Sequence, residues 1–413
     1  MDWNHISDEE LLELESRLSF AFFWNEANSN PGPGYGLIAD RAPGAKGICS
    51  VASVGFGLTG VAIAAKRGWV SHPEAEQRAL GTLTTLMNHA EQVNGFFYHF
   101  LDMETGRRSR NCEVSIIDTA LAAAGALAVG EYFGGEVQEL ADQLYRRINW
   151  PWYRNPDTNQ FYMGYSPERG FFGAWNSYAE QFMMYFLAAA SPTYPTDPDM
   201  FYNFRRLRGS YGDSPEFVYT WFGSLFAFQF SHAWFDLRGK VDRDGYDWWQ
   251  NSVSATQANR QFCIDHEAEF TTFGPNAWGL TACDGPHGYS GRYGSAPSGE
   301  NNEQHKPDGT IPPAGAAGSV VFAPQEVKRA LRHYTTYPEL WGEYGFKDAY
   351  NLDVEPHWFG SDYIGIDKGI TLLMIENYRS GFVWDTFMKS PHAVRGLELC
   401  GFRSQPVRPS VWE

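Results

Sequence analysis

Helical segments that are apolar on every side alternate along this chain with segments that are apolar on one side only. Residues 51–69 and 114–133 are apolar nearly all round, whereas 71–93 and 135–153 repeat apolar residues every three or four positions. A helix that is apolar on all sides has to be buried between other helices, and a one-sided helix can cover it. The alternation continues in the apolar runs 176–191, 214–237 and 370–389 and in the one-sided runs 196–209 and 244–266.

About six such pairs are what an inner and an outer ring of helices require. We therefore predict an all-α fold, a single (α/α)6 barrel that spans residues 1–413. Ser7 with Glu10 forms a capping box before the first helix, and Ser71 with Pro73 starts another. The alternative is a two-domain protein divided near Pro324.

Residues 271–324 are too long and too rich in glycine and proline for a simple connection. Loops of this length are usually lids or walls of functional sites. We expect this segment, together with the other long Gly/Pro-rich loops, to form part of the barrel rim.

The charge of the chain excludes one class of partner. Its 32 basic and 49 acidic residues give a net charge of −17, which repels nucleic acid. The 15 Trp and 22 Tyr residues supply rings that stack on apolar faces of sugars or bases. These features favour a carbohydrate ligand.

Cysteines and the N-terminus carry little functional signal. The five cysteines show no ligand spacing, so we expect buried thiols, no metal and no cofactor. The N-terminus lacks a basic region followed by an apolar one, and we expect no run to reach the roughly 18 apolar residues of a membrane span. We therefore expect no membrane partner and a cytoplasmic protein, or else an exported one whose signal has been removed. The oligomeric state stays open.

Polar residues near the starts of the apolar helices are candidates for a central cavity. Glu180 is expected one turn inside a helix among Phe182, Met183 and Tyr185. Burial raises the pKa of a carboxyl group and keeps it protonated, which is the state that a general acid needs. The alternative is a structural glutamate that the helix dipole stabilises.

Other polar groups have equally ordinary explanations. Asp118, five residues after Glu113, is expected to be a buried structural carboxylate, and Glu113 is the better candidate for ligand contact. His232 and Arg238 follow an aromatic helix, where they could cap its C-terminus or bind substrate. Asp362 and Asp367 precede the apolar run 370–389.

The usual nucleotide, metalloprotease and serine-hydrolase motifs are absent from the sequence. Paired carboxylates and many aromatic rings remain, and they are the composition of a glycoside hydrolase.

Nine ordered blocks then match a known family. They include CEVSIIDTALAAAGAL, NAWGLTACDGPHGY and DYIGIDKGITLLMIENYRSGFVW, and they lie at 50–58 with 66–69, 95–108, 112–127, 176–195, 228–239, 276–289, 308–319, 340–351 and 362–384. On these blocks the chain resembles the glycoamylase-like glycoside hydrolases, a family that includes endo-β-1,2-glucanases. The family fold is an (α/α)6 barrel.

The resemblance implies an inverting endo-β-1,2-glucanase that releases sophoro-oligosaccharides. It assigns Glu180 as general acid and Asp367 as general base, with a separation of roughly 6.5–9.5 Å in the usual inverting geometry. The glycines Gly365 and Gly369 would let the backbone approach the sugar. The expected substrate contacts are Glu113, Trp175, Asn176, Tyr178, His232, Arg238, Trp278, Asp284, Trp358 and Asp362, with Asp40 and Arg41 at the rim.

Two departures from the family pattern leave alternatives open. Lys368 stands where relatives usually have glutamine, and SYA precedes Glu180 where SYN or GYN is expected. An ammonium group beside Asp367 would lower the pKa of that base. The alternatives are a β-1,2-glucan transglycosylase, an exo-acting enzyme that releases sophorose or glucose, and an inactive carbohydrate-binding barrel.

Overall fold

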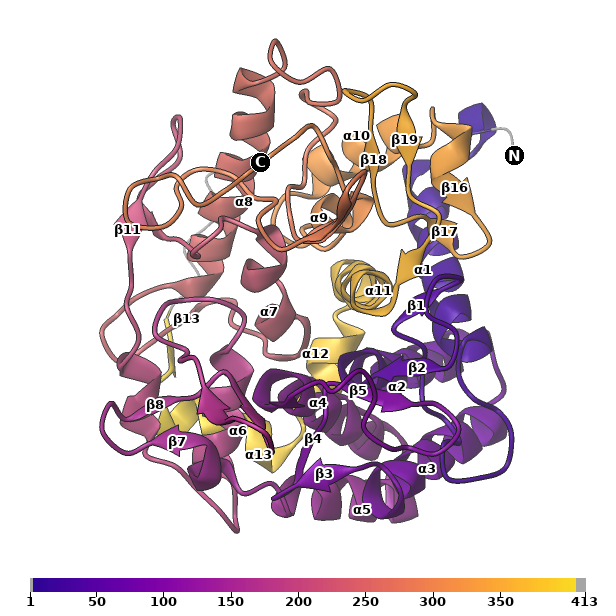
Figure 1. The fold of residues 1–413 in the computed structure, drawn as a ribbon, viewed down its shortest axis with the longest axis vertical. Helices are drawn as coiled ribbons and strands as arrows, with labels where there is room; N and C mark the ends of the chain where they lie inside the picture. Colours follow the sequence, from indigo (N-terminus) through magenta and orange to yellow (C-terminus); the bar gives the residue numbers. More distant parts are fainter. Residues whose placement is uncertain (1–2, 406–413) are drawn as a thin grey trace.

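Helices dominate the computed structural model, which describes residues 3–405. Figure 1 shows α11 end-on near the middle of the view, with α7, α9, α2 and α4 around it. The inner helices are α2 (Val51–Arg67), α4 (Ile116–Phe133), α6 (Phe182–Ala190), α7 (Phe230–Trp234), α9 (Pro313–Ala317) and α11 (Gly365–Ser380). The outer helices are α1 (Asp8–Asn25), α3 (His72–Asn88), α5 (Gly135–Arg146), α8 (Trp248–Asp265), α10 (Pro324–Tyr334), α12 (Phe382–Phe387) and α13 (Pro391–Leu399).

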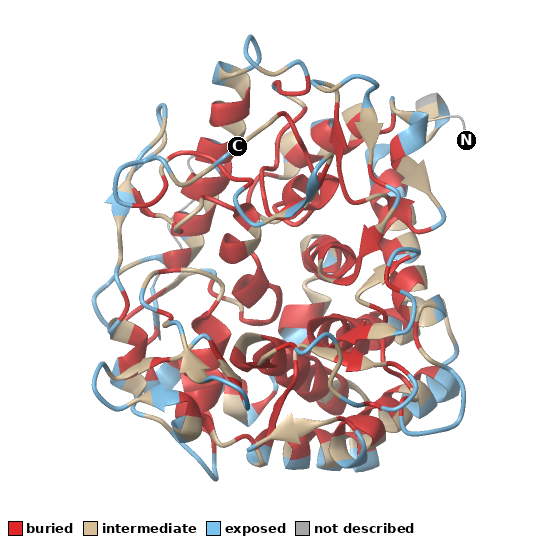
Figure 2. Ribbon diagram, viewed as in Figure 1, coloured by how far each residue is buried: buried red, intermediate tan, exposed pale blue. Residues whose placement is uncertain are grey.

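Burial follows the pattern that the sequence predicts. Every residue of α6 is buried, whereas α3 and α5 bury only one face. Figure 2 shows this contrast, with red inner helices and exposed residues along the periphery. The predicted capping box of Ser7 with Glu10 is formed. Ser71 is the N-cap of α3 and Pro73 lies in its first turn, as predicted, and Ser71 also makes a capping box with Glu74. The prediction of buried and one-sided helices is confirmed.

The inner helices pack directly on one another. Helix α2 contacts α4 and α11, α4 contacts α6, and α11 contacts α7 and α9, while α1, α3, α5, α10 and α13 cover them from outside. At the crossing of α2 and α4 a Cβ on Gly55 would lie 2.3 Å from the carbonyl oxygen of Leu121, so only glycine allows this approach. The arrangement is consistent with an α/α barrel.

The fold is less purely helical than predicted, because the loops pair as short antiparallel strands of two or three residues. The paired strands are β1 (Arg41–Ala42) with β20 (Tyr363–Ile364), β2 (Ile48–Ser50) with β5 (Phe100–Asp102), β3 (Gln92–Val93) with β4 (Phe96–Phe97), β7 (Arg154–Asn155) with β8 (Gln160–Phe161), β11 (Arg208–Gly209) with β12 (Phe217–Val218), β13 (Lys240–Val241) with β21 (Arg403–Ser404), β14 (Cys283–Gly285) with β15 (Gly288–Ser290), β16 (Trp341–Gly342) with β17 (Gly345–Phe346), β18 (Tyr350–Asn351) with β19 (Trp358–Phe359), and β9 (Gly164–Ser166) between β6 (Val114–Ser115) and β10 (Gly170–Phe172).

Three predicted segments are wrong in detail. Residues 196–209 contain no α-helix but the 3-10 turn η3 (Pro198–Tyr202) and strand β11. In 214–237 the helical residues are limited to η4 (Leu225–Phe228) and α7, and strand β12 precedes them. Conversely, the rim segment 271–324 contains the inner helix α9. Prolines at 195 and 198 and Gly223 interrupt the first two segments, and α9 is too short for periodicity to reveal. The other 3-10 turns are η1 (Trp3–His5), η2 (Trp150–Tyr153) and η5 (Pro338–Leu340).

The start of α11 is held against the first loop and α2. Strand β1 pairs with β20, so that Arg41 lies opposite Ile364, and the Gly365 amide donates to the Asp40 carbonyl at 2.8 Å. A Cβ on Gly365 would lie 2.0 Å from Ser53 Oγ, and one on Gly369 would lie 2.3 Å from the Phe56 ring. These glycines therefore serve helix packing, which corrects the expectation that they let the backbone approach a sugar.

Helix α4 meets the length and hydropathy of a membrane span, with a mean hydropathy of 1.4 over Ile116–Phe133. The sequence-based statement that no run does so is therefore wrong. Yet 78% of this stretch is buried inside the protein, as expected of the core helix that packs between α2 and α5.

One ion pair lies inside the helical core. Lys368 Nζ donates to Glu15 Oε1 at 2.5 Å and to the Phe346 carbonyl at 3.2 Å, and the two charged residues are 4% and 1% exposed. The Phe346 amide donates to the other Glu15 oxygen at 3.0 Å. Burial raises the pKa of Glu15, an effect that Lys368 offsets. The pair therefore links α1 to α11.

Removing one partner should leave an uncompensated buried charge. We expect Lys368→Met to lower the free energy of unfolding by about 3–5 kcal/mol, and the double change Glu15→Met with Lys368→Met to recover most of the loss. Urea unfolding of the three proteins measures this. As a control, Lys328→Met, which breaks the pair with the exposed Glu9, should cost about 1 kcal/mol or less. Equal losses for Lys368→Met and Lys328→Met would contradict the argument.

Candidate active site

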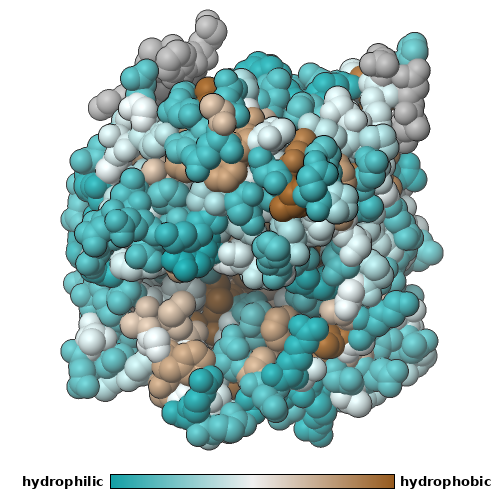
Figure 3. All heavy atoms as spheres, turned by 45° about the horizontal axis from the view of Figure 1, so that its top comes forward, coloured by the Kyte–Doolittle hydropathy of each residue, from teal (hydrophilic) through white to brown (hydrophobic). Residues whose placement is uncertain are grey.

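An open cavity of about 580 Å³ lies at the segment that leads into α6. Figure 3 shows a hollow in the molecular surface with apolar residues inside it. Glu180 lines the cavity, and so do several aromatic and apolar side chains, namely Met163, Trp175, Tyr178, Trp221, Phe222, Phe226 and Tyr289. The ring of Tyr289 is 50% exposed, which is unusual for so large an apolar group. Such exposed rings inside a hollow suit the apolar face of a sugar.

Glu180 lies just before α6, in the turn that leads into Phe182, and not one turn inside the helix as predicted. The hydroxyl of Ser231 on α7 donates to its carbonyl at 2.9 Å. Burial of the carboxyl group, together with the charge of Asp118, raises the pKa of Glu180 to about 7. The pKa of Glu180 is therefore raised as predicted, but the walls of the cavity bury the carboxyl group, and not neighbours within a helix.

Arg41 gathers the carboxylates at the other end of the site. Its Nη1 lies 3.0 and 2.8 Å from the two oxygens of Asp284 and 3.6 Å from Asp362, and its Nε lies 3.3 Å from Asp40. One guanidinium thus serves three carboxylates from the first loop, β14 and the residue before β20. The contact with Asp284, in which one nitrogen reaches both carboxylate oxygens, is the shortest of these interactions.

Asp367, in the first turn of α11, is 5% exposed and lies next to the equally buried Asp348. The two carboxyl groups lie close enough to influence each other's pKa. Burial and the charge of Asp284 raise the pKa of Asp367 to about 7, although the interaction with Asp348 and the charges of Arg41 and Lys368 lower it. The expected lowering by Lys368 is therefore present but does not decide the result, because Lys368 is turned toward Glu15.

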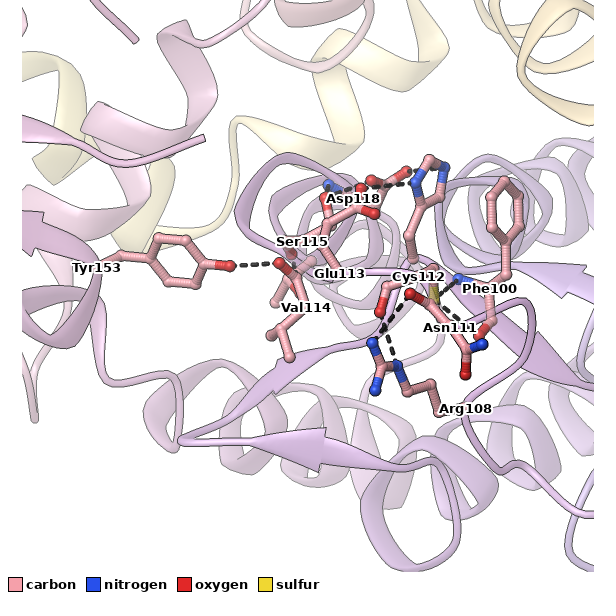
Figure 4. Close-up of polar contacts among 11 residues, drawn as sticks. Phe100, Arg108, Asn111, Cys112, Glu113, Val114, Ser115, Asp118 and Tyr153 are labelled. Carbon is pink, nitrogen blue, oxygen red and sulfur yellow. Dashed lines mark hydrogen bonds and ion pairs between the residues drawn. The ribbon is translucent and has the colours of Figure 1, made fainter. Parts of the chain in front are cut away.

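A third polar cluster, shown in Figure 4, surrounds the start of α4. His99 Nδ1 lies 2.9 Å from Glu113, and its Nε2 lies 3.8 Å from Asp118. Burial alone would lower the pKa of His99, but the charge of Asp118 and the hydrogen bond with Glu113 raise it to about 9. His99 is therefore an imidazolium at neutral pH. Ser115 is the N-cap of α4: its hydroxyl group donates to the Asp118 carboxyl group and accepts a hydrogen bond from the Asp118 amide at 3.2 Å.

The three groups adjoin one another. The charge of Asp118 contributes to the raised pKa of Glu180, and the charge of Asp40 contributes to the raised pKa values of His99 and Asp118. Asp40 also forms an ion pair with Arg41. Tyr289 lines the cavity with Glu180 and exposes half of its surface to the open hollow. The surrounding walls, together with the charges of Asp367 and Asp348, raise the pKa of its hydroxyl group. The cavity that Glu180 lines and the acidic groups that adjoin it, among them Asp367 beside Tyr289, together form the candidate cleft.

Most of the predicted contact residues lie at this cleft. Trp175, Asn176 and Tyr178 line the cavity beside Glu180. The acid-rich end holds the remaining ones, which are Asp40, Arg41, Asp284 and Asp362, and Glu113 lies with His99. Trp358 packs against the cluster of Cys283, Tyr293 and Ala349, which adjoins Asp284, so it supports that wall.

Three predicted contacts are not brought to the cleft. His232 is 2% exposed, and its Nε2 forms a hydrogen bond with the Ser252 hydroxyl at 2.9 Å. Burial lowers the pKa of His232 to about 3. Trp278 is fully buried. Arg238 pairs with Asp236 at 2.8 Å and lies over the Trp384 ring, at 4.0 Å. Packing inside the protein and a local ion pair explain these residues, so we remove them from the substrate-binding set.

Four residues of the cleft escaped the sequence analysis: His99, Trp221, Asp348 and Tyr289. Asp348 and Tyr289 stand in the matched blocks 340–351 and 276–289, so the blocks themselves were the signal. His99 also stands in a matched block, 95–108. No local pattern distinguishes these four from core residues, because their roles come from residues far away in the sequence.

The five cysteines are buried free thiols, as predicted. Within residues 3–405 no cluster of three or more His, Cys, Asp or Glu side chains has a geometry that could hold a metal ion.

Comparisons with known proteins identify the family of this chain. A family model named Glycoamylase and described as "Putative glucoamylase" matches residues 173–391, more than half of the chain. A curated relative from Parabacteroides distasonis, an exo beta-1,2-glucooligosaccharide sophorohydrolase that acts at the non-reducing end, is 26% identical over 95% of this chain. The chain spans only 58% of that relative's length.

Solved structures resemble the whole chain. An endo-beta-1,2-glucanase from Chitinophaga pinensis, in complex with sophorotriose and glucose, has a TM-score of 0.85 and 27% identity, and the match covers 97% of this chain and 99% of that one. A beta-1,2-glucanase from Parabacteroides distasonis shares the fold, with a TM-score of 0.82, 24% identity, and coverage of 96% and 60%. The resemblance to glycoamylase-like glycoside hydrolases is confirmed, and the chain belongs to the Glycoamylase family.

Proposed function

We propose that this protein hydrolyses β-1,2-linked glucan within the chain and inverts the anomeric carbon. The observation that carries the proposal is a pair of carboxyl groups, Glu180 at the aromatic cavity and Asp367 in the adjoining acidic group, each with a pKa raised to about 7. The names of the relatives supply the linkage. A cleft that is open and about 580 Å³ in volume suits an oligosaccharide.

In this mechanism Glu180 donates its proton to the glycosidic oxygen as the bond from that oxygen to the anomeric carbon breaks. Asp367 takes a proton from a water molecule, whose oxygen forms the new bond on the opposite face of the sugar. Tyr289 and Trp221 offer rings to the sugar faces. We assign subsite contacts to Asn176, Trp175, Tyr178 and Glu113, and to the group around Arg41 that comprises Asp40, Asp284 and Asp362.

The proposal extends to the architecture. Residues 1–413 act as one catalytic domain, and the six inner helices close into an (α/α)6 barrel around the cleft. The packing of α11 on α2, of α2 on α4 and of α4 on α6 supports this ring.

A second candidate is an exo-acting enzyme that releases sophorose. The curated relative that aligns with 95% of the chain is named as such an enzyme. The two candidates share the chemistry at Glu180 and Asp367 and differ only in how far the cleft extends beyond one end of the substrate.

Glu180→Gln and Asp367→Asn should each lower the release of reducing ends from linear β-1,2-glucan by at least roughly a hundredfold, because general acid–base catalysis contributes about 10²–10⁴ in rate. Glu326→Gln on α10 and Asp199→Asn in η3, both at exposed ion pairs, should keep wild-type activity. Near-wild-type turnover by either cleft variant would remove that residue from its role.

The pH dependence of kcat/KM should be a narrow bell centred near pH 7. Glu180 must be protonated, which requires a pH below its pKa, and Asp367 must be ionised, which requires a pH above its own. Activity should therefore fall about tenfold for each pH unit on either side. A flat profile between pH 5 and 9 would contradict these assignments.

Product analysis separates the remaining candidates. An endo-acting inverting enzyme should shorten long β-1,2-glucan early, and the first product detected by NMR should be the α-anomer. Sophorose as the sole early product would favour the exo candidate. Longer or cyclic glucans without a gain in reducing ends would indicate a transglycosylase, and binding without turnover an inactive barrel.

A further inference from the structure

We propose that Asp348 is a positioning residue for the base: it keeps a proton and donates it from Oδ1 to Asp367 Oδ2, so that the buried pair holds one proton. This arrangement leaves Asp367 Oδ1 for the water molecule. The inference rests on the proposed role of Asp367, but the shared proton itself can be tested without any substrate.

The two side chains are buried and incompletely satisfied. Asp348 is 4% exposed and Asp367 is 5% exposed. Asp348 Oδ1 and Asp367 Oδ2 are both buried and have no donor among the side chains and backbone of residues 3–405. Two ionised carboxylates in this position would repel each other and leave both acceptors unpaired. A proton between them removes both costs.

The backbone fixes Asp348 in place. Its Oδ2 accepts the Asp284 amide at 2.7 Å, and its own amide donates to the Asp362 carbonyl at 2.9 Å. One oxygen of Asp348 is therefore anchored to β14, and the other is left to meet Asp367. The loop before β18 holds this carboxyl group as firmly as α11 holds the base.

The nearby cations are occupied by other carboxylates. Lys368 is bound to Glu15 at 2.5 Å, and Arg41 is bound to Asp284 and Asp40. Neither can neutralise a second negative charge on the pair. The charged or titratable groups around the pair, from α1, β1, the segment before β18, β14, β15, the residue before β20 and α11, are Glu15, Arg41, Lys347, Cys283, Asp284, Tyr289, Asp362 and Lys368.

The titration of the pair agrees with this order of protonation. Burial and the charge of Asp367 raise the pKa of Asp348 well above its usual value, while Asp367 titrates near 7. Asp348 is thus the group that stays protonated when Asp367 ionises. In turnover the pair gains a second proton, on Asp367, as the O–H bond of water breaks and the new C–O bond forms. That proton then leaves to solvent.

A water molecule is the competing explanation for the two unpaired oxygens. A small cavity of about 10 Å³ adjoins both aspartates, which is roughly the room of one water molecule. A water that donated to both oxygens would leave two adjacent negative charges. The two explanations differ in the number of protonated carboxyl groups, which can be counted.

Infrared difference spectroscopy of the full chain, with no substrate, measures that number. Well above neutral pH, the wild-type protein should contain one protonated carboxyl group more than the Asp348→Asn variant, which lacks that group. The Asp367→Asn variant should also lack it, because the charge that keeps Asp348 protonated is gone. Asp353→Asn, a change at a carboxylate that only caps Thr271 and Thr272, should show no such loss. Difference spectra without a lost protonated carboxyl would overturn the proposal, and this holds even if the protein cuts no glucan.

Kinetics test the consequence for the base. Asp348→Asn keeps a hydrogen-bond donor beside Asp367, so the acid limb of its kcat/KM profile should stay within about half a pH unit of the wild-type limb. Asp348→Leu removes the donor, so the limb should move up by about one unit and kcat should fall while KM changes little. An unmoved limb in Asp348→Leu would show that Asp348 is merely structural. Inactive wild-type protein would instead contradict the proposed function.

Discussion

The close approach of α11 to α2 is the constraint on which the site depends. Gly365 and Gly369 let the first turn of α11 lie against Ser53 and Phe56, and any side chain at either position would collide with them. The same contact brings the first loop to α11 through the pairing of β1 with β20. Because two glycines allow two helices to touch, the charge of Arg41 acts on Asp367, which is more than 300 positions away in the sequence.

The second organising principle is a shortage of positive charge. The cleft contains many carboxyl groups, and they differ in whether a cation neutralises them. Asp284, Asp40 and Asp362 share Arg41, and Glu113 forms a hydrogen bond with His99. Glu180 and Asp367 receive no cation of their own, and burial raises their pKa values toward neutrality. The carboxyl groups that lack a cation are the ones that can exchange a proton during a reaction.

Lys368 illustrates why neighbours in sequence need not interact. It follows Asp367 directly, yet its ammonium points into the core and serves Glu15 of α1. In a helix, consecutive side chains diverge by about 100° around the axis, so one residue can face the cleft while the next faces the outer layer. The departure from the family pattern at Lys368 thus concerns helix packing first and the base second.

Much of the fold was readable because burial leaves a local record. A helix such as α4, apolar on all sides, has to be covered, and capping residues such as Ser7 and Ser71 mark where helices begin. Short elements such as α7 and α9 leave too little periodicity, and the paired loop strands leave almost none. Among the site residues, Glu180 and Asp367 were found through the matched blocks, whereas the local argument for Glu180 placed it in the wrong position.

By itself the sequence determined the buried and exposed faces of the long helices, the acidic and aromatic character of the ligand site, and the family. Only the tertiary structure decided that His232, Trp278 and Arg238 lie away from the cleft, that Arg41 serves three carboxylates, and that Asp348 lies beside Asp367. The physical reason is range: hydrophobic periodicity and capping act over one or two helical turns, whereas the protonation of a carboxyl group depends on every charge and wall within several ångströms, whatever its place in the chain.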